Sequence, residues 1–114
     1  MITYEDKFKE LLKELNKNEI EQTSYWEDCI PKEIYKKYFD TYTLVTAGLD
    51  TDTHRWYETS TTVIKIYGKF LGIDHIAQVF SESMGFGDCG VNINFFEMEE
   101  FTTVSYRKKE KNVK

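Results

Sequence analysis

The segment Thr62-Val-Ile-Lys-Ile-Tyr-Gly-Lys-Phe70 decides the fold, because it places a turn between two runs of β-branched and aromatic residues. Apolar residues alternate across the first run, which we expect to belong to a long strand over residues 54–67. Gly68 at the first of two central turn positions, followed by Lys69, is typical of a tight type II′ hairpin. The sequence therefore predicts two antiparallel strands joined at residue 68.

Further strands are expected on both sides of this hairpin. Residues 41–47 are rich in Thr, Tyr and Val and predict a strand, which should end at a turn-rich break over residues 48–52. Residues 73–80 fit both a helix and a strand. We favour a strand, because the hairpin leads directly into this segment.

The C-terminal part should supply one more strand. Residues 81–90 contain three glycines and predict a loop with at most one helical turn. A final strand is expected from about Val91 to Tyr106. The adjacent aromatic residues Phe95 and Phe96 interrupt its alternation, which indicates a bulge or bend.

The N-terminal third is predicted to be helical. Apolar residues recur at helical spacing through residues 3–18, where Thr3 and Asp6 form a weak capping box. Residues 18–29 allow a short second helix or a packed turn around a tryptophan. A helix from about Pro31 to Phe39 is expected, because proline favours the first helical position and an apolar stripe follows it.

These elements predict an α+β fold in which N-terminal helices pack on a curved antiparallel sheet of about four strands. We expect a single domain over residues 1–114, because a chain of 114 residues suffices for one core. It should be helical over residues 3–39, form the sheet over residues 41–107 and end in a basic, disordered tail over residues 108–114. Aromatic residues make up 16% of the chain, so the core should be largely aromatic.

The charge balance disfavours direct binding to nucleic acid. Fifteen Lys and Arg residues against twenty Asp and Glu residues give a formal net charge of -5, and such a field repels phosphate backbones. No apolar run approaches the roughly 20 residues that cross a bilayer, and the start of the sequence lacks the features of a signal peptide. Cys29 and Cys89 have no CxxC spacing, as is usual for reduced thiols. We therefore expect a cytoplasmic protein without a membrane partner.

Several motifs suggest metal chemistry but lack essential residues. Residues 50–58 have the spaced oxygens of a calcium loop, yet Arg55 occupies the sixth position, where such loops require glycine. A zinc site would need ligands in close pairs, and the candidates are single residues far apart in the sequence: Cys29, His54, His75 and Cys89. We predict neither a metal nor a cofactor.

Motifs for catalysis are similarly incomplete. No nucleophile elbow or family-type cysteine signature surrounds Cys89 or the serines. The glycines between Gly85 and Gly90 lack the Gly-Lys-Ser/Thr ending of a phosphate-binding loop. Glu97 and Glu99 share a predicted strand face and could act as acid and base, but we interpret them first as a solvated face. The sequence therefore favours a protein that is not an enzyme.

The carboxylates suggest a different role, in protein binding. Acidic residues occur near two aromatic residues and again near the end of the last strand, and together they could form an acidic patch with aromatic edges. Such a patch suits a basic protein partner, because complementary charge accelerates the encounter and buried aromatic residues supply affinity. The predicted protein-binding residues are Asp50, Asp52, Trp56, Tyr57, Glu58, Glu97, Glu99 and Glu100.

Four segments carry a resemblance to known proteins: His54-Arg-Trp-Tyr-Glu-Thr-Ser-Thr-Thr-Val63, Phe70-Leu-Gly72, Ser81-Glu-Ser-Met84 and Phe96-Glu-Met-Glu-Glu-Phe-Thr-Thr-Val-Ser-Tyr106. Over roughly residues 42–107 the chain resembles small uncharacterised proteins of phages and prophages from low-GC Gram-positive bacteria. The resemblance implies a protein that binds host or phage proteins, as anti-CRISPR and anti-restriction proteins do. It implies no functional residues.

Three functional hypotheses follow. The first is a non-enzymatic acidic protein of a phage or mobile element that binds a basic host protein, such as a CRISPR effector or another nuclease. The second is a small-ligand-binding protein or minor enzyme whose pocket is lined by Tyr, Phe and His75. The third is a phage structural or assembly protein. A homodimer through an exposed sheet edge is compatible with all three.

Overall fold

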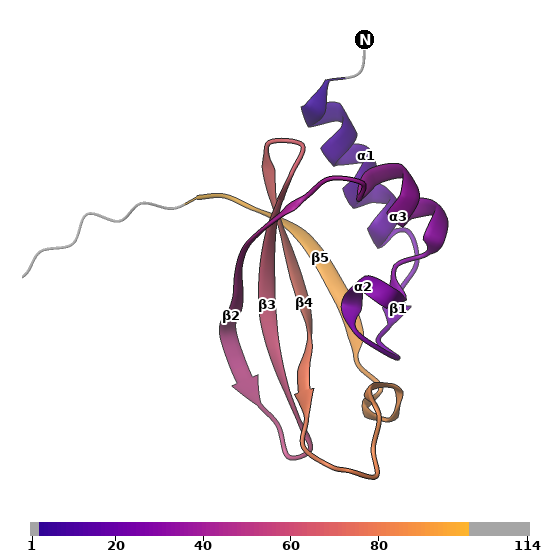
Figure 1. Cartoon of the computed structure of the whole chain (residues 1–114), viewed down its shortest axis with the longest axis vertical. Helices are drawn as coiled ribbons and strands as arrows, with labels where there is room; N and C mark the ends of the chain where they lie inside the picture. The colour runs from indigo at the N-terminus through magenta and orange to yellow at the C-terminus, as the bar shows by residue number, and fades with distance from the viewer. Residues whose placement is uncertain (1–2, 101–114) are drawn as a thin grey trace, which may run out of the picture.

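The computed structural model describes residues 3–100, in which helices pack beside an antiparallel sheet (Figure 1). The sheet has five strands in the order β1-β5-β4-β3-β2, so the predicted α+β class is confirmed, with one strand more than expected. The expected strand residues 101–107 and the tail 108–114 lie outside the described residues. The elements are α1 (Tyr4–Asn16), β1 (Ile20–Glu21), α2 (Trp26–Cys29), α3 (Lys32–Tyr38), β2 (Thr43–Thr53), β3 (Tyr57–Ile66), β4 (Lys69–Val79), the 3-10 helix η1 (Phe86–Cys89) and β5 (Asn92–Met98).

The helix α1 begins with the predicted capping box. The backbone N–H of Asp6 donates to the hydroxyl of Thr3 over 3.1 Å, and the backbone N–H of Thr3 donates to the Asp6 carboxylate over 3.5 Å. Phe8, Leu11 and Leu15 are buried along one side of the helix. The predicted helix at residues 31–39 is also confirmed as α3. Within residues 3–100, no helix is long and apolar enough to cross a membrane.

The hairpin between β3 and β4 is confirmed, but its turn lies one residue earlier than predicted. Ile66 pairs with Lys69, so Tyr67 and Gly68 are the central residues, with φ of 52° and 72°. Positive φ at both positions defines a type I′ turn, and the predicted type II′ turn at Gly68 and Lys69 is wrong. Tyr67 is held in this conformation by its hydroxyl, which donates to the carbonyl of Tyr38 over 3.0 Å.

The break predicted at residues 48–52 is wrong, because β2 runs through it as a strand with bulges. Its eleven residues lie opposite the eight residues 58–65 of β3, so β2 contains three extra residues, one at each of three register shifts. Gly48 and Asp50 adopt positive φ of 79° and 48° near these shifts. The turn-forming residues therefore produce bulges, which increase the local twist and curl the sheet.

The other strand predictions have mixed outcomes. The segment 73–80 is a strand as favoured, and the glycine-rich loop contains only the short helix η1. A bulge or bend was predicted at Phe95 and Phe96, and the bulge is wrong, since these residues pair in continuous register with Ile73 and Gly72. Two adjacent aromatic residues fit a regular strand here because each finds contacts on its own face of the sheet: Phe95 joins the core, and the half-buried Phe96 packs over Gly72.

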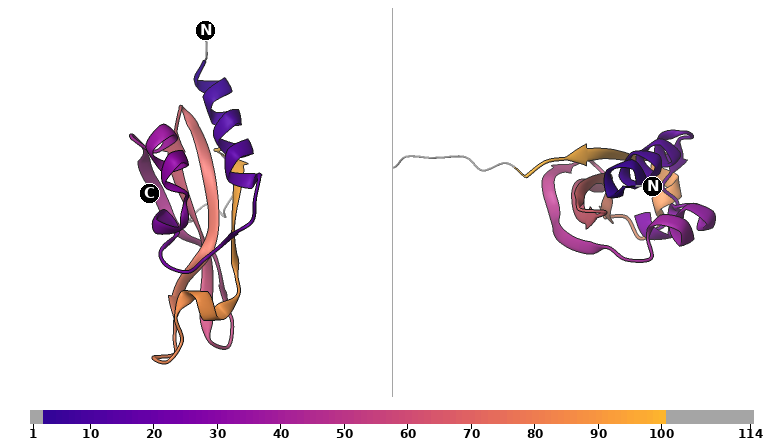
Figure 2. Two further views of the ribbon diagram at one scale, coloured as in Figure 1. Left: turned by 90° about the vertical axis from the view of Figure 1, so that its right-hand side faces the viewer. Right: turned by 90° about the horizontal axis from the view of Figure 1, so that it is seen from above.

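The main core lies between the helices and one face of the sheet. Seen from above, α1 and α3 lie to one side of the β3–β4 hairpin, and β2 curves round the other side (Figure 2). Every second residue of the central strands contributes to this core, as the strand periodicity requires. The core residues from the strands are Ile64, Ile66, Leu71, Ile73, Ile93 and Phe95.

A buried glutamine joins β1 to β4, a connection that the sequence did not predict. The Gln22 side chain is fully buried; its amide oxygen accepts from the backbone N–H of Ile76 over 2.6 Å, and its NH₂ group donates to the Ile76 carbonyl over 3.1 Å. These bonds satisfy backbone groups beside the bulge in β4 that would otherwise be buried without partners. Gln22 therefore fixes the segment before α2 against the sheet.

Candidate functional site

The candidate site is the sheet face opposite the helices, which we call the free face. Strand residues that alternate with the core residues project onto it, among them Thr61 and Val63 of β3. Thr61 is 4% exposed and Val63 is 6% exposed, although no described helix residue lines this face. They are buried because the sheet curls: β2 and β5 line the same hollows although two strands separate them in the sheet order.

The larger hollow of the free face is an acidic cavity of about 390 Å³. Asp50 and Asp52 of β2 and Asp74 of β4 supply carboxylates, and Asn92 and Asn94 of β5 supply carboxamides. No Lys or Arg lines this cavity, so its carboxylates favour cationic groups. The other lining residues are Thr59, Ser60, Thr61, His75, Val91, Phe96 and Met98.

One carboxylate of this cavity is oriented by a hydrogen bond. The hydroxyl of the buried Thr61, the cross-strand partner of Asp74, donates to the Asp74 carboxylate. Asp74 is half-buried, whereas Asp50 and Asp52 lie on an exposed strand at the rim. The cavity thus combines one fixed acceptor with two exposed ones, of which the Asp52 carboxylate lies 3.4 Å from the Nε2 atom of His54.

The smaller hollow is an apolar groove of about 180 Å³ next to the acidic cavity. Val45 and Leu49 form its β2 wall and remain 49% and 38% exposed. Met98 lines both hollows, so they are adjacent. The other lining residues are Thr46, Val63, Phe70, Glu99 and Glu100.

Gly72 creates the floor shared by the two hollows. A Cβ atom at this position would lie 2.4 Å from the Phe96 ring and 2.6 Å from the Met98 sulfur, which is closer than atoms can approach. Glycine therefore allows both side chains to lie flat against β4. The result is an apolar floor that leads from the acidic cavity to the groove.

The predicted protein-binding residues divide between different parts of the sheet. Asp50 and Asp52 line the acidic cavity, and Glu99 and Glu100 line the apolar groove. Glu97 lines neither hollow and forms an ion pair with Lys69, with 3.9 Å between nitrogen and oxygen. The structure thus brings four of the eight residues to the free face.

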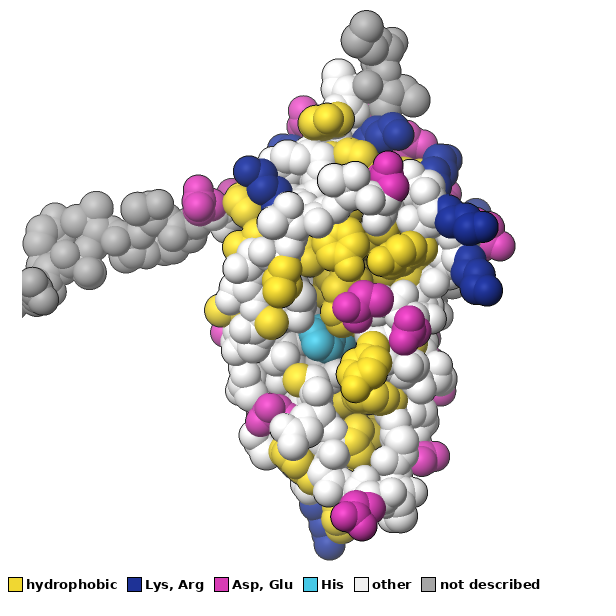
Figure 3. Space-filling model, viewed as in Figure 1, with side chains coloured by type: hydrophobic (Ala, Val, Ile, Leu, Met, Phe, Trp, Pro, Cys, Tyr) yellow, Lys and Arg dark blue, Asp and Glu magenta, His cyan; other side chains and the backbone are white. Residues whose placement is uncertain are grey.

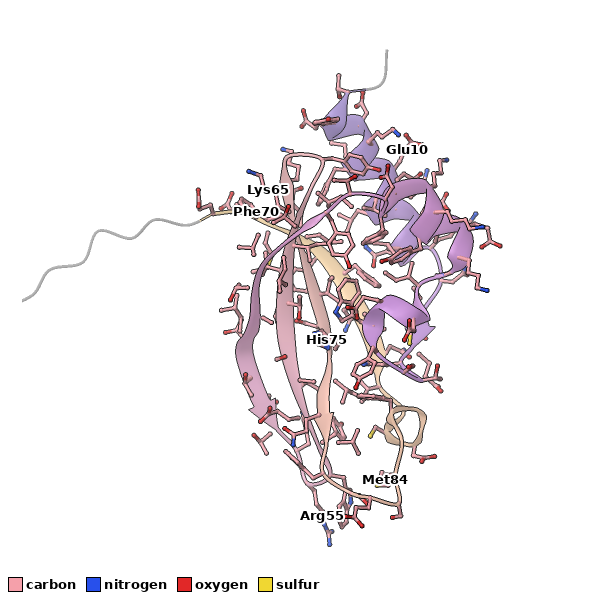
Figure 4. All side chains as sticks on the ribbon, in the orientation of Figure 1. Glu10, Arg55, Lys65, Phe70, His75 and Met84 are labelled. Atoms are coloured by element: carbon pink, nitrogen blue, oxygen red, sulfur yellow. The ribbon has the colours of Figure 1, made fainter. Side chains whose placement is uncertain are left out.

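The remaining three predicted residues lie at the connection between β2 and β3. Trp56 is 46% exposed, and the Arg55 guanidinium lies 4.8 Å from its ring centre. Tyr57 stacks on His54 with ring centres 4.6 Å apart, and Glu58 accepts a hydrogen bond from Thr53 over 3.4 Å. Glu58 and Glu97 pair with β4 residues seven positions apart, which corresponds to roughly 23 Å along the strand. Figure 4 shows Arg55 at one tip of the molecule, and Lys65 and Phe70 toward the other.

His75 lines the acidic cavity, but it alternates with Asp74, and its ring lies on the helix side of the sheet, where other protein groups engage it. The Nε2 atom of His75 lies 2.7 Å from the Thr62 hydroxyl, and its Nδ1 atom lies 3.0 Å from the Ile76 carbonyl. The carbonyl can only accept, so Nδ1 donates to it, while Nε2 and the Thr62 hydroxyl share a hydrogen bond. The ring also packs near Trp26, with ring centres 6.5 Å apart. Within residues 3–100, no three His, Cys, Asp or Glu side chains are grouped so that they could hold a metal ion.

Lys and Arg side chains are distributed unevenly between the helices and the sheet. On the side seen in Figure 3, most Lys and Arg side chains lie over the helices, and few lie over the sheet. Neither hollow of the free face is lined by Lys or Arg. The ammonium group of Lys65 lies 5.9 Å from the ring centre of Phe70, at the end of the groove away from the acidic cavity.

Comparisons with protein families, with curated proteins and with solved structures found no match to this chain.

Proposed function

We propose that this chain is a non-enzymatic acidic binding protein whose free face engages a basic surface on another protein. The observation that carries the proposal is the lining of the two hollows, which contains five carboxylates and neither Lys nor Arg. The net charge of -5 adds a long-range attraction for basic partners. The five carboxylate residues are Asp50, Asp52, Asp74, Glu99 and Glu100.

Binding fits these carboxylates better than acid-base catalysis does. A general acid needs a raised pKa, which usually requires burial or a nearby like charge. Four of the five residues are exposed, namely all except Asp74, so water solvates their charges. Solvated carboxylates at the rim of a hollow instead attract cations and lose little hydration before a partner arrives.

The more specific proposal concerns the partner. We propose that the chain acts in the cytoplasm of an infected bacterium as an inhibitor of a host protein that handles nucleic acid, such as a CRISPR effector or a restriction nuclease. The resemblance to phage-borne proteins supports this proposal, and so does the charge: a basic cleft that binds phosphates also attracts carboxylates. In this proposal the free face competes with nucleic acid for the cleft.

The experiment measures binding of the full-length chain to purified CRISPR effectors and restriction nucleases, together with inhibition of DNA cleavage. The test variant combines Asp50→Asn with Asp52→Asn. The control combines Glu10→Gln with Glu14→Gln on the exposed surface of α1, which changes the net charge equally. We expect at least a tenfold loss of affinity for the test variant and less than a twofold loss for the control. Equal losses, or no inhibition of any nuclease, would contradict the proposal.

A second candidate function is the binding of a small cationic ligand. The acidic cavity, at about 390 Å³, falls within the range of roughly 300–1,000 Å³ that is typical of small-molecule sites. A ligand that binds only the folded chain raises its melting temperature. Thermal scans with a series of amines and guanidines test this function, and an unchanged melting temperature throughout would count against it.

A further inference from the structure

The two hollows of the free face are arranged along one strand. Thr59 lines the acidic cavity and Val63 lines the apolar groove. Both belong to β3, four residues apart, and point to the same face, so their side chains lie roughly 13 Å apart. Met98 lines both hollows, and Phe96 lies beside it in the acidic cavity, so an apolar surface separates the two. Thr61, two residues from Val63, also lines the cavity, so the cavity extends from roughly 7 Å to roughly 13 Å from Val63, and its far end is at Thr59, the cross-strand partner of Asp52. A molecule that reaches both the groove and Asp52 must therefore be apolar at one point and cationic about 13 Å away.

The groove has room for one large apolar side chain. Its volume is about 180 Å³, and an apolar cavity of about 150 Å³ in a protein can hold a benzene ring. Val45, Leu49, Val63, Phe70 and Met98 provide its apolar contacts. A leucine or phenylalanine side chain from a partner matches both the size and the chemistry of this hollow.

The acidic cavity matches a guanidinium group better than an ammonium group. Three carboxylates and two carboxamides line it, and a guanidinium has five N–H donors against three for an ammonium. The Phe96 ring on the floor offers a flat surface over which a planar cation can stack. Asp74, held by Thr61, supplies an acceptor of fixed orientation. Arginine is therefore the expected occupant.

We propose that the free face binds an extended segment of a partner protein that carries a large apolar side chain and an arginine four residues apart. In an extended chain these two side chains point to the same side and lie roughly 13 Å apart, which matches the two hollows. The spacing is the same for either direction of the segment. A second copy of this chain fits the face poorly, since it would bring two sets of carboxylates together. The inference rests on the proposed function and specifies the partner of that same site.

The test uses synthetic nine-residue peptides with a fluorescent label and the full-length chain, with binding measured by fluorescence anisotropy. The parent peptide contains Leu-Ser-Thr-Ser-Arg between Gly and Ser residues, and a second peptide reverses this order. One control has the same composition with Leu and Arg adjacent, and another replaces Arg by Lys. We expect one or both spaced peptides to bind at least ten times more tightly than the adjacent control and about three times more tightly than the Lys peptide. Affinities of all four peptides within twofold of one another, or no saturable binding, would overturn the inference.

Variants of the chain locate the two contacts. Asp52→Asn should lower the affinity for the spaced peptide at least fivefold and leave the affinity for a peptide without Arg unchanged. Phe70→Ala should lower the affinity for the spaced peptide at least fivefold and leave the affinity for a peptide without Leu unchanged. Glu10→Gln on α1 is the control and should change neither. If basic proteins bind through Asp50 and Asp52 but the peptide spacing has no effect, the inference fails while the proposed function stands. If neither the binding of basic proteins nor the binding of the peptides depends on these carboxylates, the inference and the proposed function both fail.

Discussion

The two faces of β4 differ in what they contact, although they share one backbone. Leu71 and Ile73 are completely buried under the helices, whereas Gly72 and Asp74 belong to the free face. The covered face is almost wholly apolar and fixes the position of the strand. The free face combines carboxylates, carboxamides and an apolar floor that other parts of the described chain leave uncovered. The difference suggests that stability depends mainly on the first face and recognition on the second.

The largest expected effect on the free energy of unfolding comes from truncating one of two neighbouring residues of β4. Leu71→Ala should lower the free energy of unfolding by about 2–5 kcal/mol, because it leaves a cavity in the closed core. Phe70→Ala removes more atoms but should cost only roughly 1–2 kcal/mol, because the ring is half-buried and opens onto a groove. Urea denaturation of the two variants measures both values. Equal losses would mean that the free face contributes to the core as much as the covered face does.

The next effect concerns the floor of the free face. Gly72→Ala should destabilise the chain by about 1–3 kcal/mol, because the new methyl group overlaps both the Phe96 ring and the Met98 side chain. In a Phe96→Ala background the same substitution should cost at least 1 kcal/mol less, which a double-mutant cycle detects as a coupling of about that size. Additive losses would show that the strain at this position has another source.

A smaller effect is the pH dependence of stability that Tyr42 causes on the helix side of the sheet. Burial and the neighbouring Tyr35 raise the pKa of Tyr42 to about 12, against an ordinary value of 10.0. Its neutral form is favoured in the folded chain, so this stabilisation is fully present below pH 10 and is lost as pH rises through about 12. Tyr42 is only partly buried, so the loss should be on the order of 1 kcal/mol. Urea denaturation between pH 9 and 12 should show that the free energy of unfolding falls more steeply for the natural chain than for Tyr42→Phe. Parallel curves for the two chains would disprove this role of Tyr42.

The smallest effect tests whether Asp50 and Asp52, at the rim of the acidic cavity, contribute to the stability of the fold. Asp50→Asn together with Asp52→Asn should change the free energy of unfolding by less than about 0.5 kcal/mol, because both side chains are exposed. Thermal and urea denaturation check this expectation. A loss above about 2 kcal/mol would assign these residues to folding and weaken the contrast between the two faces.

Local sequence signals predicted much of the fold. The capping box at Thr3, the apolar spacing of α1 and the hairpin around Gly68 each involve residues close together in the chain. The predictions were wrong where the same local residues are compatible with two different structures. Gly48 and Asp50 permit positive φ in a bulge as readily as in a turn, and only the long pairing with β3 selects the bulge. The two-residue strand β1 was missed, because its pairing with β5 spans more than seventy positions.

The candidate site was predicted less completely than the fold. Asp50, Asp52, Glu99 and Glu100 were identified because acidic residues stand out in the sequence. Asp74, Asn92 and Asn94 were missed, although each alternates with core residues of its strand: Ile73 precedes Asp74, and Ile93 lies between the two asparagines. That alternation places them on the face opposite the core. The curl that brings β2 and β5 to the same hollow depends on three bulges, and the turn-forming residues near them, Gly48 and Asp50, fit a turn equally well.

The three extra residues of β2 have a further consequence for solubility. Leu44, Val45 and Leu49 are exposed on a strand at the end of the sheet order, and a straight strand of this kind would be a template for the strands of other molecules. The bulges interrupt the regular spacing of backbone donors and acceptors along its outer side. A neighbouring molecule can therefore match only short stretches at a time. The irregularity that shapes the free face thus also protects the chain against edge-to-edge aggregation.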